Sequence, residues 1–237
     1  GGRGSIILKY TKYIPKTLLK INNITFLDYL LNFYAKFNFK NIYILVGYKS
    51  RFFKKYNNRK NSLSIIKCIA EKEKLDTGGA LLQIKKKLNF FLINIDSFFE
   101  YDFFKFAKHK ISKNAYGKII LLDNKNYKSN NKLSNLKVKK SKIIFGGKLM
   151  NGGVYHLKTK ILKLIKKKKS LEKDIFPELI KKNKLDGYYQ NTRFIDIGTY
   201  KNLKKSNTFF KDKENISAVF FDRDGVINYD KKYVYKI

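Results

Sequence analysis

Residues 90–97 read FFLINIDS, an apolar run that ends in an aspartate. The run from Phe90 to Ile95 is typical of a strand buried on both faces of a sheet, although Asn94 interrupts it. Asp96 follows directly, at a position where a carboxylate is costly unless it is paired or binds a metal. The stretch therefore predicts a core strand that carries a functional carboxylate at its end.

Similar strand patterns recur along the chain, and amphipathic stretches lie between them. This alternation predicts an α/β fold, Rossmann-like, with a mostly parallel sheet that helices cover on both faces. Ligands of such sheets bind beyond the carboxyl ends of the strands, so Asp96 is expected at the ligand edge. The other predicted strands are 41–47, 64–70 and 118–122, and the predicted helices are 26–37, 77–88, 158–169 and 171–181.

Polar, weakly patterned segments interrupt this alternation. The Lys- and Asn-rich residues 124–142 predict an irregular loop. Ser170 is a candidate N-cap for the helix that follows it. After Thr199 we expect a short helix, which closes a domain of residues 1–206. A linker over 207–215 and the start of a second domain over 216–237, with a buried strand at 216–221, should follow.

The composition narrows the class of protein. The chain has 237 residues, of which 43% are hydrophobic, so it can bury a core. The single Cys, Cys68, excludes an internal disulfide and fits a reducing compartment. One Cys and two His are too few for a zinc site of the usual kind. Neither a signal peptide nor an apolar run near the ~18 residues of a membrane span is visible, which predicts a cytoplasmic protein without a membrane partner. Because the only Met is Met150, the N-terminus is expected to be clipped.

The formal net charge of +35 comes almost entirely from Lys. Lys, Asn, Ile, Phe and Tyr are all abundant and share A/T-rich codons, so we interpret the charge as compositional drift on solvated faces. A basic nucleic-acid-binding module is the alternative. We expect no nucleic-acid partner, but phosphate-bearing substrates would still be attracted by the positive field.

The chain opens on a glycine-rich stretch that suits phosphate binding. Glycines let backbone N–H groups approach phosphates closely, although such loops are often only turns. Lys16 follows Pro15, which would hold a positive charge in a fixed place beside a phosphate. As one of many lysines, it could equally be a surface residue. The loop residues are Gly1, Gly2, Arg3, Gly4 and Ser5.

Asp196 repeats the arrangement of Asp96, because it lies within a second apolar stretch, FIDIGT at 194–199. Mg²⁺ is usually held by one or two carboxylates together with substrate phosphates. Two strand-end aspartates therefore predict a nucleotide–metal site. Either one alone could instead be a helix N-cap or a turn residue.

Together, and in this order, these motifs resemble the sugar 1-phosphate nucleotidyltransferase family over about residues 1–206. The opening loop and Pro15-Lys16 resemble the family's nucleotide-binding motifs. Asp96 and Asp196 align with its two metal-binding aspartates. Further segments match the family's base-contacting motif (residues 76–80, with Gly78 and Gly79), its sugar-contacting strand (Asn151, Gly152 and Gly153) and the segment that closes over the sugar (Glu172 and Lys173).

The resemblance implies a mechanism. An oxygen of the sugar phosphate attacks the α-phosphorus of a nucleoside triphosphate, and pyrophosphate leaves, so positioning and charge stabilisation dominate. Asp96 and Asp196 would hold Mg²⁺, while Lys16 and the loop amides bind phosphates. No general base is required, because the attacking phosphate is already anionic.

The sequence also departs from the family pattern. Ile6 stands where the family usually has a phosphate-binding Arg, and Asp76 replaces a Gly. The usual Glu-Lys pair upstream of the sugar strand is not recognisable, and the strand expected before Gly1 is missing. A weakened, regulatory homologue therefore remains an alternative to an active enzyme.

The last segment carries a second resemblance. Residues 218–228 read AVFFDRDGVIN and resemble the first motif of haloacid dehalogenase-type phosphatases. That likeness makes Asp222 the phosphoryl-accepting nucleophile and Asp224 the general acid, with both also binding Mg²⁺. The chain stops before the family's later motifs.

Within its family, the nucleotidyltransferase part resembles the manno-heptose 1-phosphate guanylyltransferase branch. The last segment resembles heptose bisphosphate phosphatases. The two resemblances agree chemically, because removal of the 7-phosphate from a heptose 1,7-bisphosphate leaves the 1-phosphate that the transferase would activate. The expected substrates are therefore GTP and heptose 1-phosphate, used for surface polysaccharide. Mannose and glucose 1-phosphate are the rival sugars.

Overall fold

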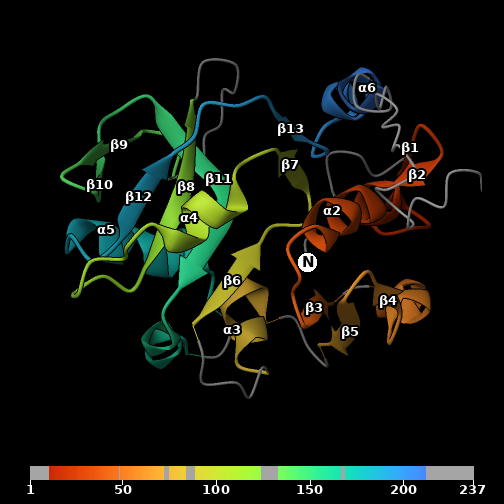
Figure 1. The fold of residues 1–237 in the computed structure, drawn as a ribbon, viewed down its shortest axis with the longest axis horizontal. Coiled ribbons are helices and arrows are strands. Elements are labelled where there is room, and N and C mark those ends of the chain that lie inside the picture. Colours follow the sequence, from red (N-terminus) through yellow and green to blue (C-terminus); the bar gives the residue numbers. More distant parts are fainter. Residues whose placement is uncertain are drawn as a thin grey trace, which may run out of the picture.

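The computed structural model describes residues 11–47, 49–71, 75–83, 89–123, 133–166 and 169–211. Their largest element is a six-stranded sheet in the order β6-β11-β8-β12-β10-β9, which forms the left half of Figure 1. The strands are β6 (Phe90–Ile93), β8 (Gly117–Asp123), β9 (Leu136–Lys139), β10 (Lys142–Phe145), β11 (Leu149–Leu157) and β12 (Asp186–Tyr189).

The α/β class is confirmed, but the sheet is mixed rather than mostly parallel. β8 and β12 pair in parallel, whereas β11 runs antiparallel to both β6 and β8. β9 and β10 are joined by Lys140 and Ser141, whose φ angles are 47° and 65°. Two-residue turns with positive φ connect only antiparallel strands, so this hairpin adds two antiparallel strands, and β9 also pairs antiparallel with β11.

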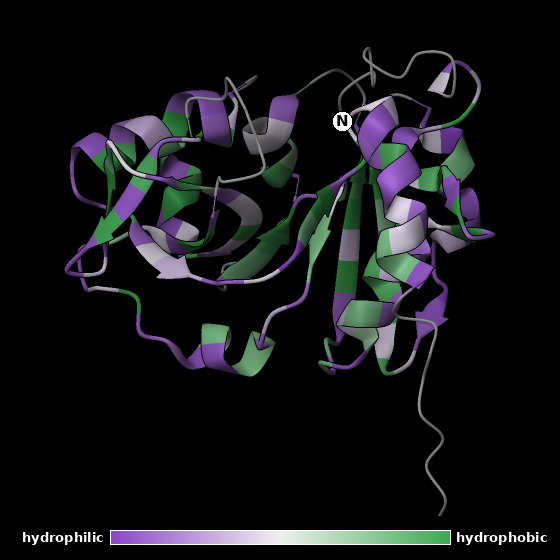
Figure 2. Cartoon of the chain, turned by 90° about the horizontal axis from the view of Figure 1, so that it is seen from above, coloured by the Kyte–Doolittle hydropathy of each residue, from purple (hydrophilic) through white to green (hydrophobic). Residues whose placement is uncertain are grey.

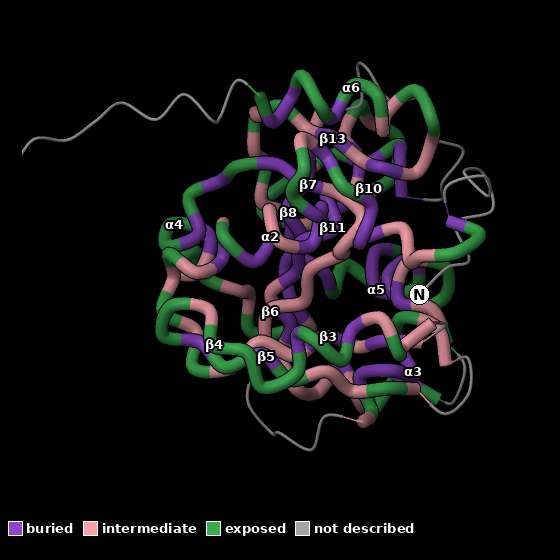
Figure 3. Tube along the Cα trace, turned by 90° about the vertical axis from the view of Figure 1, so that its right-hand side faces the viewer, coloured by how far each residue is buried: buried purple, intermediate pink, exposed green. Residues whose placement is uncertain are grey.

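β8 shows why the predicted core strands are apolar throughout. Ile119 and Leu121 enter the hydrophobic cluster on one face of the sheet, and Ile120 and Leu122 enter the cluster on the other face. Because successive side chains of a strand point to opposite faces, a strand covered on both sides needs apolar residues at every position. In Figure 3 the buried segments β8 and β11 run through the middle of the molecule.

Helical segments cover both faces of this sheet, as predicted (Figures 1 and 2). Each turns its apolar side chains towards the strands, which leaves polar residues on the outside. One face packs against α2 (Phe26–Ala35), α4 (Phe103–Lys108) and α6 (Tyr200–Lys211); the other packs against α3 (Asp76–Leu81), the 3-10 turn η4 (Thr159–Leu164), the π-helical turn η5 (Leu171–Ile175) and α5 (Phe176–Lys181).

α2 links the large sheet to a smaller one of order β3-β5-β4. The helix places Phe26 and Leu30 in the large-sheet cluster, and it places Leu27 and Leu31 in the cluster of the smaller sheet. Thr25 caps the helix, because its Oγ1 accepts a hydrogen bond from the Asp28 backbone N–H. The smaller sheet consists of β3 (Asn41–Val46), β4 (Lys60–Asn61) and β5 (Ser64–Ala70), with the 3-10 turn η3 (Ser50–Tyr56) beside it.

Two short strand pairs complete the described fold. β1 (Lys20–Ile21) and β2 (Ile24–Thr25) form a hairpin just after the 3-10 turn η2 (Lys16–Leu18). β7 (Ser97–Phe99) pairs antiparallel with β13 (Phe194–Asp196). The second pair joins segments almost a hundred residues apart. It therefore brings the end of β6 next to the C-terminal part of the described chain.

Several predicted boundaries need correction. The segment 124–142 is not all irregular, because it contains β9. The hairpin was missed because its turn lacks the Gly or Asn that usually signals such turns. The helix predicted over 158–169 is only the turn η4, since Lys160, Lys163 and Lys166 repeat at a spacing that places like charges side by side. α6 continues to Lys211, into the predicted linker, because Phe209 and Phe210 are buried.

Residues 1–10 and 212–237 lie outside the described part of the chain. The predicted strand at 216–221 and the second domain therefore remain predictions. Within the described residues, none of the helices has the length and apolar character needed to cross a membrane.

Candidate active site

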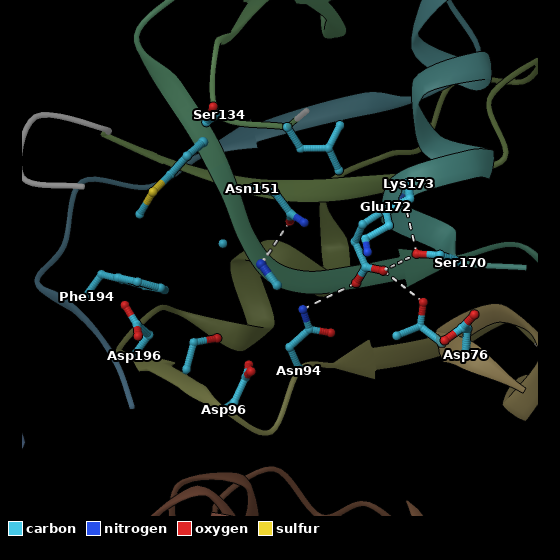
Figure 4. Close-up of a pocket in the computed structure, with 16 residues that line it drawn as sticks. Asp76, Asn94, Asp96, Ser134, Asn151, Ser170, Glu172, Lys173, Phe194 and Asp196 are labelled. Carbon is cyan, nitrogen blue, oxygen red and sulfur yellow. Dashed lines mark hydrogen bonds between the residues drawn. The ribbon is translucent and has the colours of Figure 1, made fainter. Parts of the chain in front are cut away.

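A pocket of about 510 Å³ lies at the carboxyl end of β6, the edge where the sequence predicts a ligand site (Figure 4). The residues just after β6, together with segments from β7, β11, β13, α3 and η5, contribute to its wall. The lining residues are Asp76, Thr77, Asn94, Asp96, Ser97, Leu133, Ser134, Met150, Asn151, Gly152, Gly153, Ser170, Glu172, Lys173, Phe194 and Asp196.

The structure brings Asp96 and Asp196 into this one pocket. Asp196 ends β13 and stands opposite Ser97 in the β7–β13 pair. The backbone N–H of Ile197 donates to the carbonyl oxygen of Asp96 over 3.0 Å, which holds the two strand ends together. Figure 4 shows both carboxylates at the same end of the pocket.

The Asp196 carboxylate is held in place by its own loop. Its Oδ1 accepts a hydrogen bond from the Gly198 backbone N–H over 2.7 Å, and its Oδ2 accepts one from Asn202 Nδ2 over 2.7 Å. Each oxygen keeps further lone pairs for another ligand. These hydrogen bonds therefore orient the Asp196 carboxylate and leave both of its oxygens able to bind a further ligand.

Lys16 reaches the same end of the pocket. Its Nζ lies 2.7 Å from Asp96 Oδ2, and the two side chains are 18% and 48% exposed. Lys16 begins η2 directly after Pro15, whose fixed φ sets the direction of the chain at that point. Lys16 thus places its positive charge beside Asp96, one of the two predicted metal ligands.

The charges that line the pocket are mostly negative, in a chain whose net charge is +35. Among the lining residues that the structure describes, Asp76, Asp96, Glu172 and Asp196 are acidic and Lys173 is basic. Hard carboxylate oxygens that are partly exposed suit Mg²⁺, which keeps several positions for water and phosphate oxygens. Asp96 and Asp196 therefore fit a magnesium ion by their chemistry.

Asn151, Gly152 and Gly153 form the middle of the pocket wall, where β11 bulges away from β8. The Asn151 side chain is fixed at both ends: Oδ1 accepts from the Gly153 backbone N–H (2.9 Å), and Nδ2 donates to the Tyr155 hydroxyl (2.8 Å). Gly153 has a φ of +79°, and a Cβ there would lie 3.0 Å from that of Asn94. Both the backbone conformation and the tight contact favour glycine at this position.

Glu172 and Lys173 lie at the opposite end of the pocket from Asp96, on the turn η5 (Figure 4). Ser170 caps this turn as predicted, because its Oγ accepts from the Lys173 backbone N–H over 3.2 Å. The first turn is π-helical, a distortion that recurs at functional sites. The Glu172 carboxylate accepts hydrogen bonds from several neighbouring elements.

Gly78 and Gly79, predicted to bind the nucleotide, are buried in α3 and do not line the pocket. A Cβ at Gly78 would come within 2.4 Å of the Lys169 carbonyl oxygen, which also accepts a hydrogen bond from the Gly78 N–H. The structure thus gives Gly78 a packing role, in which α3 approaches the backbone before η5. Asp76, just before them, does line the pocket and has a φ of +55°.

The pocket collects most of the described residues that the sequence singles out, and it adds others. Asn94 was not predicted as a site residue, and Tyr155 was predicted only as the last residue of the sugar-contacting segment 151–155, yet both bond to Glu172. No local signal marks these two contacts, since Glu172 lies 78 positions from Asn94 and 17 from Tyr155 along the chain. Gly1, Gly2, Arg3, Gly4, Ser5, Asp222 and Asp224 lie outside the described residues.

Known proteins resemble this chain over most of its length. The family model described as "Nucleotidyl transferase" matches residues 1–213. A D-glycero-α-D-manno-heptose 1-phosphate guanylyltransferase from Campylobacter jejuni is 30% identical over 210 residues, which cover 84% of this chain and 91% of the relative. A protein of the same name from Aneurinibacillus thermoaerophilus is 28% identical, covering 87% and 94%. The crystal structure of HddC from Yersinia pseudotuberculosis superposes with a TM-score of 0.67 at 25% identity, covering 83% and 90%.

Proposed function

This chain belongs to the nucleotidyl transferase family, and on that premise we propose that it couples a nucleoside triphosphate to a sugar 1-phosphate. One observation carries the proposal. Asp96, Asp196 and Lys16 meet at one end of a pocket whose other end holds Glu172 and whose wall is the Asn151–Gly153 segment. Charge for phosphates and polar groups for a sugar therefore share one cavity.

The chemistry follows from the charges. The sugar phosphate oxygen forms a new bond to the α-phosphorus, and the bond from that phosphorus to the β-phosphate oxygen breaks, releasing pyrophosphate. Both substrates are anions, while the pocket itself is acidic, so they need cations to approach each other. The Lys16 ammonium group supplies one of these cations, because it is placed to leave its ion pair with Asp96 and bind a substrate phosphate instead.

We assign the magnesium site to Asp96 and Asp196. A bound Mg²⁺ would screen the triphosphate from the carboxylates and stabilise the charge that develops on the leaving pyrophosphate. The hydrogen bonds from Gly198 and Asn202 keep the Asp196 carboxylate oriented. The attacking phosphate is already ionised at neutral pH, so this step needs no general base.

For the particular substrates we propose GTP and a manno-heptose 1-phosphate, in a route to surface polysaccharide. Two relatives that each cover most of this chain are named as guanylyltransferases of that sugar phosphate. Asn151, Glu172 and Lys173 supply the hydrogen-bonding groups that a polyhydroxylated sugar requires. Mannose and glucose 1-phosphate are the competing sugars.

The decisive experiment measures pyrophosphate release from a panel of nucleoside triphosphates and sugar 1-phosphates with Mg²⁺ present. We expect the highest kcat/KM with GTP and the heptose 1-phosphate. Efficient turnover of glucose 1-phosphate with no use of the heptose would disprove the substrate assignment alone. Substrate binding without pyrophosphate release from any pair would instead favour the regulatory homologue suggested by Ile6.

We also propose that residues 216–237 begin a sugar bisphosphate phosphatase domain, on the basis of the DRDG motif at 222–225. Asp222 would accept the phosphoryl group and Asp224 would protonate the leaving sugar oxygen. In a chain that extends past Ile237, release of inorganic phosphate from heptose 1,7-bisphosphate should be lost in Asp222→Asn while pyrophosphate release continues. Equal phosphate release by the variant would contradict the assignment.

A further inference from the structure

The Glu172 carboxylate lies at the centre of a hydrogen-bond network at the Lys173 end of the pocket. Its Oε2 accepts from Thr77 Oγ1 over 2.8 Å and from Ser170 Oγ over 3.4 Å. Its Oε1 accepts from the Tyr155 hydroxyl over 3.1 Å and from Asn94 Nδ2 over 3.4 Å. Each oxygen therefore has one short and one long hydrogen bond. Figure 4 shows those from Ser170 and Asn94 converging on Glu172.

These four donors occupy the acceptor positions of the Glu172 carboxylate. An ionised carboxylate offers about four lone-pair positions, so a sugar hydroxyl can bond to Glu172 only by displacing a protein donor. Bonds of 3.4 Å are at the weak limit, whereas hydroxyl-to-carboxylate bonds are short and charge-assisted. The bonds from Asn94 and Ser170 are therefore the ones that substrate would replace, and both residues line the pocket.

The two shorter bonds, from Tyr155 and Thr77, come from different environments. The Tyr155 side chain is fully buried and does not line the pocket. Its hydroxyl accepts from Asn151 Nδ2 over 2.8 Å while it donates to Glu172, so it ties the wall of the pocket to this end. Burial, with the nearby Glu172 charge, raises the pKa of Tyr155 well above its usual value, so the proton stays in place. Thr77 Oγ1 accepts from the Leu171 N–H over 3.0 Å, which ties α3 to η5.

We propose that Tyr155 and Thr77 are positioning residues of the sugar site: they hold the two Glu172 oxygens while two sugar hydroxyls replace Asn94 and Ser170. The inference rests on the proposed function and goes beyond it, because it assigns Tyr155, which the substrate does not touch. The displaced Asn94 amide and Ser170 hydroxyl become free to donate to oxygens of the sugar. The site thus recognises a pair of neighbouring hydroxyls.

Tyr155→Phe tests this most directly, because it removes only the hydroxyl. We expect the KM for the sugar 1-phosphate to rise about tenfold, since a hydrogen bond to a charged group is lost. The kcat and the KM for the nucleotide should change less than about threefold, because the lost contact orients the bound sugar and not the reacting phosphates. Isothermal titration of the sugar 1-phosphate should show the same loss of affinity.

Tyr101→Phe is the matched control. Tyr101 is also buried, and its hydroxyl bonds to that of Tyr34 over 3.3 Å, away from the pocket. The Tyr101→Phe variant should be less stable, because it loses a buried hydroxyl hydrogen bond, but the KM values for the sugar 1-phosphate and the nucleotide should not change. A similar rise in the sugar KM in both variants would mean a general packing effect and would overturn the inference.

Thr77→Val and Thr77→Ser test the other oxygen at an exposed position. Valine also removes the acceptor for the Leu171 N–H, which serine keeps, so thermal unfolding of both variants must accompany the kinetics. Valine should raise the sugar KM several-fold, and serine, which keeps the hydroxyl, should restore it. Wild-type turnover with an unchanged sugar KM in Tyr155→Phe and Thr77→Val would overturn this inference alone. A wild-type protein that neither binds sugar 1-phosphates nor releases pyrophosphate would overturn the proposed function and this inference with it.

Discussion

Asp96 and Asp186 show how differently one residue type is used at the two ends of the large sheet. Asp96 follows β6 at its carboxyl end, is about half exposed and has Lys16 as its charged partner. Asp186 begins β12 and is fully buried. It accepts hydrogen bonds from the Ser112 N–H (2.6 Å) and hydroxyl (3.1 Å) and pairs with Lys142 Nζ at 2.5 Å.

The contrast continues in the lysines around them. Lys16 is partly exposed and placed to change partners, whereas Lys118, beside Asp186 in the β8–β12 pair, is fully buried. Lys118 Nζ donates to the carbonyl oxygens of Phe106, Ala107 and His109, at the C-terminal end of α4. Burial lowers the pKa of Lys118 to about 8. A charge whose partners are all supplied by the fold maintains structure, while one with free coordination positions serves a ligand.

The largest effect should come from Asp96→Asn. We expect turnover to fall by roughly 10²- to 10³-fold, the usual result of removing one electrostatic contact to a transition state. The free energy of unfolding should change by less than about 1 kcal/mol, because an exposed ion pair contributes little. Pyrophosphate release and urea denaturation measure the two quantities, and a wild-type rate in the variant would remove Asp96 from the site.

Asp186→Asn should show the reverse pattern. Loss of the buried charge leaves Lys142 and Ser112 imperfectly paired, which should cost about 3 kcal/mol of unfolding free energy. The kcat of the folded protein should stay within about twofold of the wild type. If instead catalysis fell with no loss of stability, the division between the two ends of the sheet would be wrong.

His156 offers a smaller test, through pH. It stacks on Phe91 at 4.2 Å, and within the described chain its buried Nδ1 has no hydrogen-bond partner. Burial, reinforced by the Lys118 charge, lowers the pKa of His156 to about 4. The unfolded chain binds a proton near pH 6.5 and the folded one does not, so this residue reduces stability as pH falls from about 6.5 to about 4.

His156→Phe should remove that dependence. We expect a gain of about 1 kcal/mol at pH 7.5, because a buried unpaired nitrogen is removed, and a larger gain at pH 5. Urea denaturation at the two pH values measures both. An unchanged pH slope in the variant would mean that His156 is protonated in the fold.

The smallest effect concerns Asp76, a pocket carboxylate on a left-handed backbone with φ of +55°. Asp76→Gly should change the free energy of unfolding by less than about 0.5 kcal/mol, since glycine adopts this conformation freely but is more disordered when unfolded. Asp76→Ala should cost about 1 kcal/mol, because alanine is strained there. Equal stabilities of the two variants, measured by thermal unfolding, would contradict the strain.

Much of the candidate site was predictable because it lies at strand ends. The position of Asp96 after an apolar run and the order of the motifs indicated both the pocket edge and Asp196. The hairpin at β9 and β10 was not predictable, since Lys140 and Ser141 adopt positive φ without the usual turn residues. The nucleotide-binding role of Gly78 stays a prediction, and the sequence did not show that its missing side chain makes room for the Lys169 carbonyl.

The amino-acid sequence by itself determined the alternation of core strands and helices, because apolar periodicity is a local property of the chain. It marked Asp96 as a candidate ligand, but it did not indicate which partners Asp96 or Asp186 would have. Only the tertiary structure decided that one meets Asp196 across the β7–β13 pair and the other is enclosed by Ser112 and Lys142. The physical reason is distance along the chain: the partners that set a carboxylate's solvation and charge are 44 to 100 residues away.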